Sequence, residues 1–228
     1  MNGQDRREDL RAQFDEARAQ FEATNARIEK KAGRNLFLAI GSGLIFGGLF
    51  IASLFIVKQS FIVLVAALIS VALVELAQAF RTAGRRVPRV GVVIGGLVIV
   101  AGAAFWGAEG ALLGLFAGSL LLTLWRMIEG LFPAWETAPR TLIRDVFSGL
   151  FTLVYVAFLA SFSVLLVQAP RGEWWVLALG VTVVSVDVGA YAAGVTLGKH
   201  KMTPRISPNK TWEGFGGAAV LAMVSGVI

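Results

Sequence analysis

Two long stretches of the chain contain no charged residue. Residues 35–57 form a run of 23 without Asp, Glu, Lys or Arg, and residues 146–170 form another of 25. An apolar helix of about 20 residues is long enough to cross the ~30 Å hydrocarbon layer of a membrane. The chain is 56% hydrophobic and has no cysteine. This pattern excludes a soluble globular enzyme, a disordered chain and a disulfide scaffold.

The apolar runs predict an all-α fold, a polytopic transmembrane helical bundle of about six full spans plus the start of a seventh. The expected spans are residues 35–57, 59–80, 90–108, 110–128, 146–168 and 174–196, and a last run covers 214–228. That last run has 15 residues and would reach only about 22 Å as a helix. We therefore expect a C-terminally truncated piece of a longer protein, whose transmembrane domain at 35–228 is incomplete.

The distribution of basic residues predicts the orientation of the bundle. With the N-terminus in the cytoplasm, 19 of the 21 Lys and Arg residues fall on the inner side, as the positive-inside rule requires. The net charge of +6 then reflects orientation, and no nucleic-acid partner is expected. We expect a multi-pass protein of the bacterial cytoplasmic membrane with its active site facing the cytoplasm.

Residues 1–34 are polar and form a predicted cytoplasmic or interfacial amphipathic helix. A narrow, mostly apolar stripe runs along it at spacings of four and three, formed by Leu10, Phe14, Ala17, Phe21, Thr24 and Ile28. Such a stripe is typical of an interfacial helix or short coiled coil. Two interpretations stay open: the helix helps to form a homodimer, or it packs lightly on the cytoplasmic face.

Two carboxylates, Glu75 and Asp187, fall inside the predicted spans. Ionisable residues at membrane depth are costly and usually mark function. Helix rise places both nearer the cytoplasm, where they would line one water-filled cavity. The alternative is that each is satisfied by a neighbouring helix or extends to the interface.

The stretch after Asp187 combines glycines, basic residues and a helix-start signal. Gly189, Gly194 and Gly198 allow close helix packing, and the basic residues Lys199, His200, Lys201 and Arg205 follow. Ser207 is the predicted N-cap and Pro208 the first helical residue. Lys210 in the first turn has the wrong sign for the helix dipole, unless a phosphate lies between them. Ordinary positive-inside charge is the alternative.

At these residues the chain resembles the phosphatidate cytidylyltransferase (CDP-diacylglycerol synthase) family. The matching residues are Asp187, Ala190, Tyr191, Gly194 and Gly198, then Ser207, Pro208, Lys210, Thr211, Glu213 and Gly214. The resemblance is specific but covers only about 30 residues. The family's downstream Lys-Asp and His-Gly-Gly segment is missing, so we expect this chain alone to be inactive.

The resemblance implies that CTP and phosphatidic acid react to give CDP-diacylglycerol and pyrophosphate, with Mg²⁺ alone or with a second cation. The active-site segment would be 187–214. It implies catalytic roles for Asp187, Lys210 and Glu213, with Asp187 also the metal ligand. Glu213 would orient Lys210 or join the metal shell. The implied substrate-binding residues are Lys199, Lys201, Arg205, Ser207 and Thr211.

Three other functions are compatible with parts of the sequence. A CTP-dependent polyprenol or lipid kinase would release CDP instead of pyrophosphate. An ion-coupled transporter would use Glu75 and Asp187 as a relay, although the halves show no repeat. A membrane scaffold would need no phosphate-binding loop.

Overall fold

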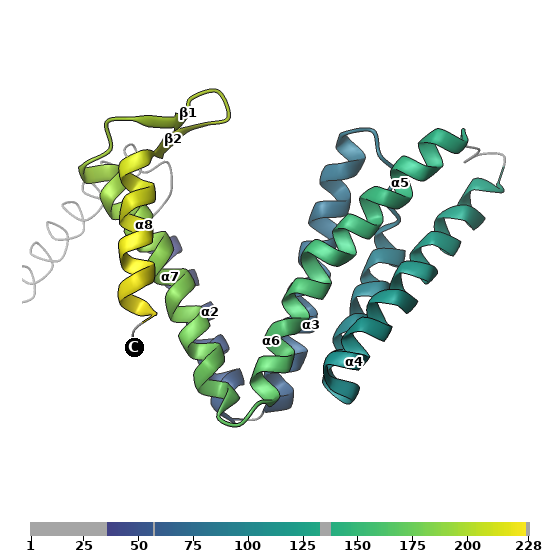
Figure 1. The fold of residues 1–228 in the computed structure, drawn as a ribbon, viewed down its shortest axis with the longest axis horizontal. Coiled ribbons are helices and arrows are strands. Elements are labelled where there is room, and N and C mark those ends of the chain that lie inside the picture. Colours follow the sequence, from purple (N-terminus) through teal and green to yellow (C-terminus); the bar gives the residue numbers. More distant parts are fainter. Residues whose placement is uncertain (1–35, 57, 133–137, 227–228) are drawn as a thin grey trace, which may run out of the picture. The chain divides into compact units, whose positions relative to one another are not determined.

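The computed structural model describes residues 36–56, 58–132 and 138–226, so the predicted helix at 1–34 lies outside the described residues. The chain divides into two compact units, residues 1–52 and 53–228, and each is described by itself. In the first unit the described part is the beginning of α2 (Leu36–Ile56). The remaining elements are α3 (Lys58–Thr82), α4 (Arg89–Gly130), α5 (Pro139–Thr152), η2 (Leu153–Phe158), α6 (Leu159–Gln168), α7 (Gly172–Thr196), β1 (Lys201–Thr203), β2 (Ser207–Thr211) and α8 (Trp212–Ser225) (Figure 1).

Four helical segments of the described chain are long and apolar enough to cross a membrane. They are Lys58–Thr82, Arg89–Gly130, Pro139–Gln168 and Gly172–Thr196, and Gly41–Ile56 is a shorter apolar helix. Large apolar side chains such as Phe116, 73% exposed, lie on their surfaces, where a bilayer replaces water as the solvent. The predicted helical membrane protein is confirmed. The count of six spans and the cytoplasmic N-terminus stay predictions.

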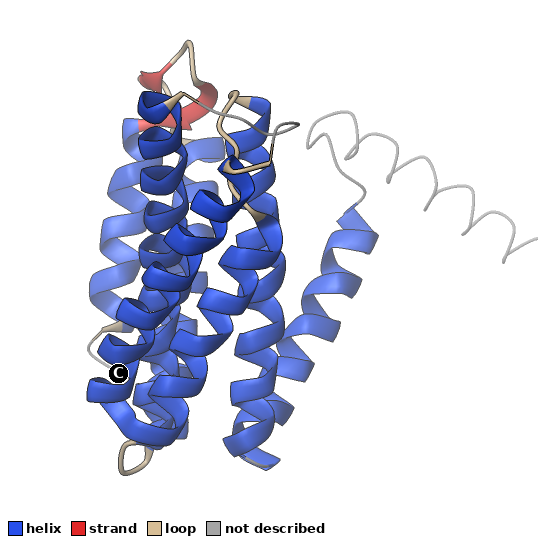
Figure 2. Ribbon diagram, turned by 90° about the vertical axis from the view of Figure 1, so that its right-hand side faces the viewer, coloured by secondary structure: helices blue, strands red, loops and turns tan. Residues whose placement is uncertain are grey.

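The all-α prediction needs one correction, because β1 and β2 form a two-stranded antiparallel sheet. Figure 2 shows these strands in red beside helices that make up nearly all of the described chain. The 199–214 segment was expected to be a loop followed by a helix. Pairing between its two halves satisfies backbone groups that a loop would leave to water.

The helix α4 contains two antiparallel limbs joined at Gly107. This residue has φ +64° and ψ −146° inside an otherwise helical segment, a conformation open to glycine and strained for other residues. A Cβ on Gly102 would collide with the carbonyl of Gly110, and one on Gly118 would lie 2.8 Å from the carbonyl oxygen of Gly95. The predicted helices at 90–108 and 110–128 are therefore the two limbs, packed through glycines.

The π-helical segment η2 keeps one face of the Pro139–Gln168 segment buried. Across η2 the buried residues Gly149, Leu153, Ala157 and Ser161 lie four positions apart, whereas on either side spacings of three also occur, as from Asp145 to Ser148 and from Ser161 to Val164. On an α-helix of 3.6 residues per turn, the three steps of four from Gly149 to Ser161 would rotate the stripe by about 120°. The wider turn of a π-helix holds more than four residues, so it keeps the stripe against α4.

A glycine turn ends α3 and positions the loop that follows. Gly84 has φ +74°, and its N–H donates to the carbonyl of Arg81 at 3.0 Å. The N–H of Arg85 donates to the carbonyl of Phe80 at 2.9 Å, which completes a Schellman motif. The Arg85 guanidinium lies over the Phe80 ring, 5.6 Å from its centroid. This contact stands where the motif usually has a hydrophobic one, and it fixes the direction of Arg85.

Candidate active site

The four basic side chains predicted to neutralise phosphates lie on or beside one β-hairpin. Strands β1 and β2 pair with Lys201 opposite Thr211. The exposed cations of this segment are Lys199, Lys201, Arg205 and Lys210. Within the described residues none of these four forms an ion pair. The hairpin therefore presents uncompensated positive charge, which favours binding of an anion.

The predicted start of the last helix is wrong by four residues. Ser207 and Pro208 belong to strand β2, and Lys210 lies in the same strand instead of in a helical turn. Thr211 is the N-cap of α8, and its Oγ1 accepts the N–H of Gly214 at 3.1 Å. The Ser-Pro sequence favours a helix start, but pairing with β1 holds the backbone of these residues in an extended conformation. Lys210 therefore does not lie in the first turn of a helix, and its charge does not oppose a helix dipole there.

The glycines that follow Asp187 make room for this cap. Thr211 is only 5% exposed. A Cβ on Gly198 would lie 2.9 Å from the Oγ1 of Thr211, and one on Gly194 would lie 3.5 Å from the same atom. The end of α7, the hairpin and the start of α8 therefore pack as one unit around the Thr211 side chain.

Glu213 closes the base of the hairpin through His200. Its carboxylate lies 2.6 Å from His200 Nδ1 and accepts the His200 N–H at 3.2 and 3.3 Å. The His200 carbonyl in turn accepts the N–H of Trp212 at 3.0 Å. The hydrogen bond from the His200 side chain is the main reason that the pKa of Glu213 falls from 4.5 to about 2. The observed partner of Glu213 is thus His200, and its catalytic role stays a prediction.

Asp187 lies on α7 away from the hairpin end of that helix. It is nine residues before Thr196, where α7 ends, which corresponds to roughly 13 Å of helix rise. Its side chain is exposed, as is that of Glu75 on α3. Close packing of α7 on α8 involves the next glycine, since a Cβ on Gly189 would lie 2.6 Å from the carbonyl oxygen of Gly217. The shared cavity for Asp187 and Glu75 stays a prediction.

The described residues contain no group of three or more His, Cys, Asp or Glu side chains placed to hold a metal ion. Asp187 can supply one carboxylate, since it is exposed and has no hydrogen bond or ion pair with other described residues. Mg²⁺ is often held by one or two carboxylates together with substrate phosphates and water. Asp187 therefore fits such an ion as one ligand among several.

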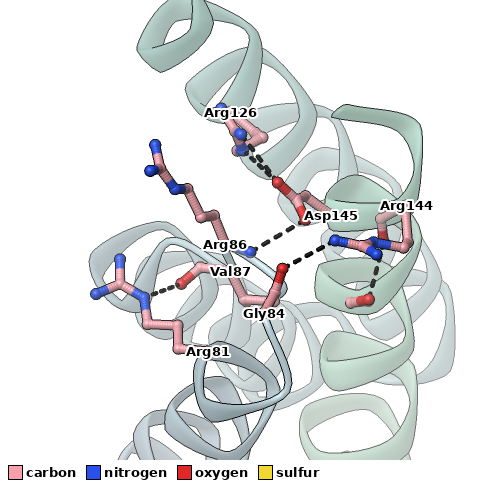
Figure 3. A network of polar contacts seen from close by, with 8 residues as sticks. Arg81, Gly84, Arg86, Val87, Arg126, Arg144 and Asp145 are labelled. Atoms are coloured by element: carbon pink, nitrogen blue, oxygen red, sulfur yellow. Dashed lines mark hydrogen bonds and ion pairs between the residues drawn. The ribbon is translucent and has the colours of Figure 1, made fainter. Parts of the chain in front are cut away.

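A buried ion pair that the sequence analysis missed lies between α4 and α5. Asp145 Oδ2 accepts from Arg126 Nη2 at 2.9 Å and from Nε at 3.3 Å, and both side chains are at most 1% exposed. Asp145 Oδ1 accepts the backbone N–H of Arg86 at 3.0 Å. Figure 3 shows this carboxylate between the guanidinium group and the loop. One buried carboxylate thus holds together α4, α5 and the loop after α3.

The sequence did contain a signal for this pair. Arg126 interrupts the apolar run of one predicted span, and Asp145 immediately precedes the 25-residue charge-free run of the next. Opposite charges at neighbouring ends of consecutive antiparallel helices are candidates for pairing.

The cytidylyltransferase family matches residues 38–228. A phosphatidate cytidylyltransferase of Mycobacterium bovis is 35% identical over 203 residues, which is 87% of this chain and 66% of the relative. One from Mycobacterium leprae is 35% identical over 206 residues, with the same two shares. One from Bacillus subtilis is 34% identical over 115 residues, 50% of this chain and 39% of the relative.

The chain spans at most 66% of the length of these relatives. No solved structure matches it significantly. The matched region contains the hairpin and the start of α8, with the basic residues described above.

Proposed function

The chain belongs to the cytidylyltransferase family, and from this premise we propose that the whole protein makes CDP-diacylglycerol and pyrophosphate from CTP and phosphatidic acid. Relatives named phosphatidate cytidylyltransferase, 35% identical over 87% of the chain, support this substrate pair. The structural observation that carries the proposal is the exposed, unpaired set of basic side chains on the hairpin at the start of α8.

The reaction is a nucleotidyl transfer between two highly charged substrates. An oxygen of the lipid phosphate attacks the α-phosphorus of CTP, the new P–O bond forms, and the bond to the leaving pyrophosphate breaks. Positively charged side chains stabilise charge that develops on phosphate oxygens. We assign this role to Lys199, Lys201, Arg205 and Lys210. Hydroxyls of Ser207 and Thr211 are further candidates for substrate binding, although Thr211 already caps α8.

Glu213 and Asp187 have different positions and receive different roles. Glu213 holds His200 and thereby the base of the hairpin, so we propose that it positions the basic residues for the phosphates. Asp187 would bind Mg²⁺ as one carboxylate ligand. When bound, Mg²⁺ would hold the triphosphate and offset charge on the leaving pyrophosphate.

We further propose that the hairpin faces the cytoplasm. If α3, each limb of α4, the Pro139–Gln168 segment and α7 each cross the bilayer, the α3–α4 loop and the hairpin lie on the same side. Both segments are rich in Arg or Lys, as cytoplasmic loops are. With α2 added, this gives six crossings and places the N-terminus inside the cell. This orientation exposes the hairpin to CTP in the cytoplasm.

The experiment that tests the function follows both products. The whole protein in detergent is given phosphatidic acid, Mg²⁺ and radiolabelled CTP, and CDP-lipid and pyrophosphate are measured. We compare Asp187→Asn with Glu75→Gln, which removes the other exposed carboxylate of the predicted spans. Outer-shell partners of metal sites contribute about 10–100-fold, so loss of a direct ligand should lower the rate by at least about 100-fold. Glu75→Gln should leave the rate within about twofold.

Other products would redirect the proposal. Release of CDP together with a phosphorylated alcohol would identify a lipid kinase. Lack of CTP turnover by a folded whole protein would refute the enzyme, and ion-flux measurements would then test a transporter. Equal losses in both variants would refute the specific role of Asp187 while leaving the reaction in place.

A further inference from the structure

A second group of basic side chains surrounds the loop between α3 and α4 and the start of α5. We call it the arginine cluster, and it consists of Arg81, Arg85, Arg86, Arg89, Arg140 and Arg144. Arg85 is half-buried and the other five are exposed. Within the described residues none of the six is in an ion pair. The nearby carboxylate of Asp145 is fully buried and forms an ion pair with Arg126, so it does not compensate the exposed charge of the arginine cluster.

Three of these arginines are each held in place by a hydrogen bond from one nitrogen of their own guanidinium group. They are Arg81 (Nε to the Val87 carbonyl, 3.0 Å), Arg85 (Nη1 to Ser148 Oγ, 3.0 Å) and Arg144 (Nη2 to the Gly84 carbonyl, 2.8 Å). Each keeps its other guanidinium N–H groups unused by described residues. A guanidinium presents five donors in a rigid fork that suits phosphate. Side chains that are already oriented lose less conformational freedom when they bind a ligand.

Arg86 contacts the buried carboxylate through its backbone. Asp145 accepts the N–H of Arg86 at 3.0 Å, while the Arg86 side chain is exposed. Figure 3 shows the guanidinium groups of Arg81 and Arg86 both extending away from Asp145. The loop thus presents oriented guanidinium groups beside the buried ion pair of Arg126 and Asp145, whose charges offset each other.

Exposed aromatic side chains continue directly from the arginines along α5 and η2. Phe151 is 51% exposed and Tyr155 59% exposed, and their rings stack with centroids 5.3 Å apart. Phe151 also makes an edge contact with Phe80, the ring below Arg85. Tyr is typical of the level where lipid headgroups meet acyl chains, and Phe151 stacks on Tyr155 there. A ligand that fits both features has a phosphate at one end and an apolar chain at the other.

We propose that the arginine cluster binds the phosphate headgroup of an anionic membrane lipid, with the acyl chains lying along Phe151 and Tyr155. Clusters of four to eight Lys or Arg beside a membrane helix attract anionic lipids. Beyond that general attraction, the hydrogen-bonded guanidinium groups define where the phosphate would bind, and the aromatic surface defines where the acyl chains would lie. The inference uses other elements than the hairpin and does not rest on the proposed reaction.

The test measures lipid binding to the whole protein in detergent by native mass spectrometry. Phosphatidylglycerol is the anionic probe, phosphatidylcholine the zwitterionic probe, and inorganic phosphate the competitor without acyl chains. Arg86→Gln removes one exposed charge but keeps the backbone N–H that Asp145 needs. The matched control is Arg171→Gln, which removes one exposed charge from the loop before α7. Arg89→Gln is a second test variant, since its exposed side chain also forms no ion pair with described residues.

We expect phosphatidylglycerol to bind more tightly than phosphatidylcholine. Arg86→Gln and Arg89→Gln should each weaken its binding by about fivefold, the contribution of one basic residue near an anionic surface. Arg171→Gln should leave binding unchanged, and equimolar inorganic phosphate should not compete. If Arg171→Gln weakened phosphatidylglycerol binding as much as the test variants, the loss would follow from net charge alone, and the proposal would be overturned. Equal binding of phosphatidylcholine, or competition by phosphate, would also overturn it.

Discussion

Removing the charge of Asp145 should destabilise this protein far more than removing a typical surface charge. Its carboxylate accepts three hydrogen bonds, two from Arg126 and one from the N–H of Arg86. Asp145→Asn keeps the shape but removes the negative charge that the buried Arg126 guanidinium meets at 2.9 Å. Breaking a buried pair by removing one partner costs about 3–5 kcal/mol. We expect the free energy of unfolding to fall by that amount.

Replacing both partners should be much less harmful. Arg126→Met/Asp145→Leu removes both charges of this pair, and apolar replacement of such a pair is neutral or stabilising by about 1–4 kcal/mol. The Arg86 N–H then loses its acceptor, which costs about 1–3 kcal/mol. These two effects have opposite signs, so the double variant should lie within about 3 kcal/mol of the unchanged protein.

The assay is unfolding in mixed micelles by titration with a denaturing detergent, followed by helical circular dichroism. The matched control is Lys58→Met, which breaks the pair between Lys58 and Glu173 (3.3 Å). Their side chains are 49% and 24% exposed. A partly exposed pair of this kind contributes about 0–1 kcal/mol. If Asp145→Asn costs no more than Lys58→Met, or if the double variant is less stable than the single one, the reasoning from burial is refuted.

Four further predictions concern the limbs of α4, the hairpin and the helix α8. Gly102→Val should cost more than the ~1–3 kcal/mol typical of overpacking, because it drives a side chain into the opposite limb. Gly216→Ala, with open space around its Cα, should not reduce thermal stability. Thr211→Ala should lower the unfolding free energy by about 1 kcal/mol through loss of the N-cap. The low pKa of Glu213 means that its contact with His200 stabilises the fold fully above about pH 4.5, and that this contribution is lost as the pH falls towards 2. His200→Ala should return that pKa towards 4.5, which carbon-13 shifts of the labelled carboxyl would detect; an unchanged pKa would contradict the assignment.

The positions of the helices were predictable because they depend on local composition. A chain segment in hydrocarbon must satisfy its own backbone groups, which restricts an isolated span to a helix. The predicted runs at 59–80 and 174–196 therefore coincide closely with Lys58–Thr82 and Gly172–Thr196. The basic residues of the candidate site were also visible, because their type and spacing are properties of the sequence.

The errors arose where a distant segment changed the local preference. Ser207 and Pro208 carry a helix-start signal, but Lys201–Thr203 pairs with their strand, and the helix begins only at Trp212. A helix signal depends on adjacent residues, whereas a strand needs a partner whose register the sequence does not state. The β-hairpin was therefore missed although its basic residues were identified.

Composition and a short motif were enough to predict a helical membrane protein and to indicate its family. The reversal of α4 at Gly107, the cap of α8 by Thr211 and the contact of Arg126 with Asp145 across 19 positions of sequence became visible only in the folded chain. Hydropathy reports the free energy of each residue in its solvent, so it locates segments one by one. Partners for buried charges and backbone groups depend on which segments come together, and that is set by packing of the whole chain.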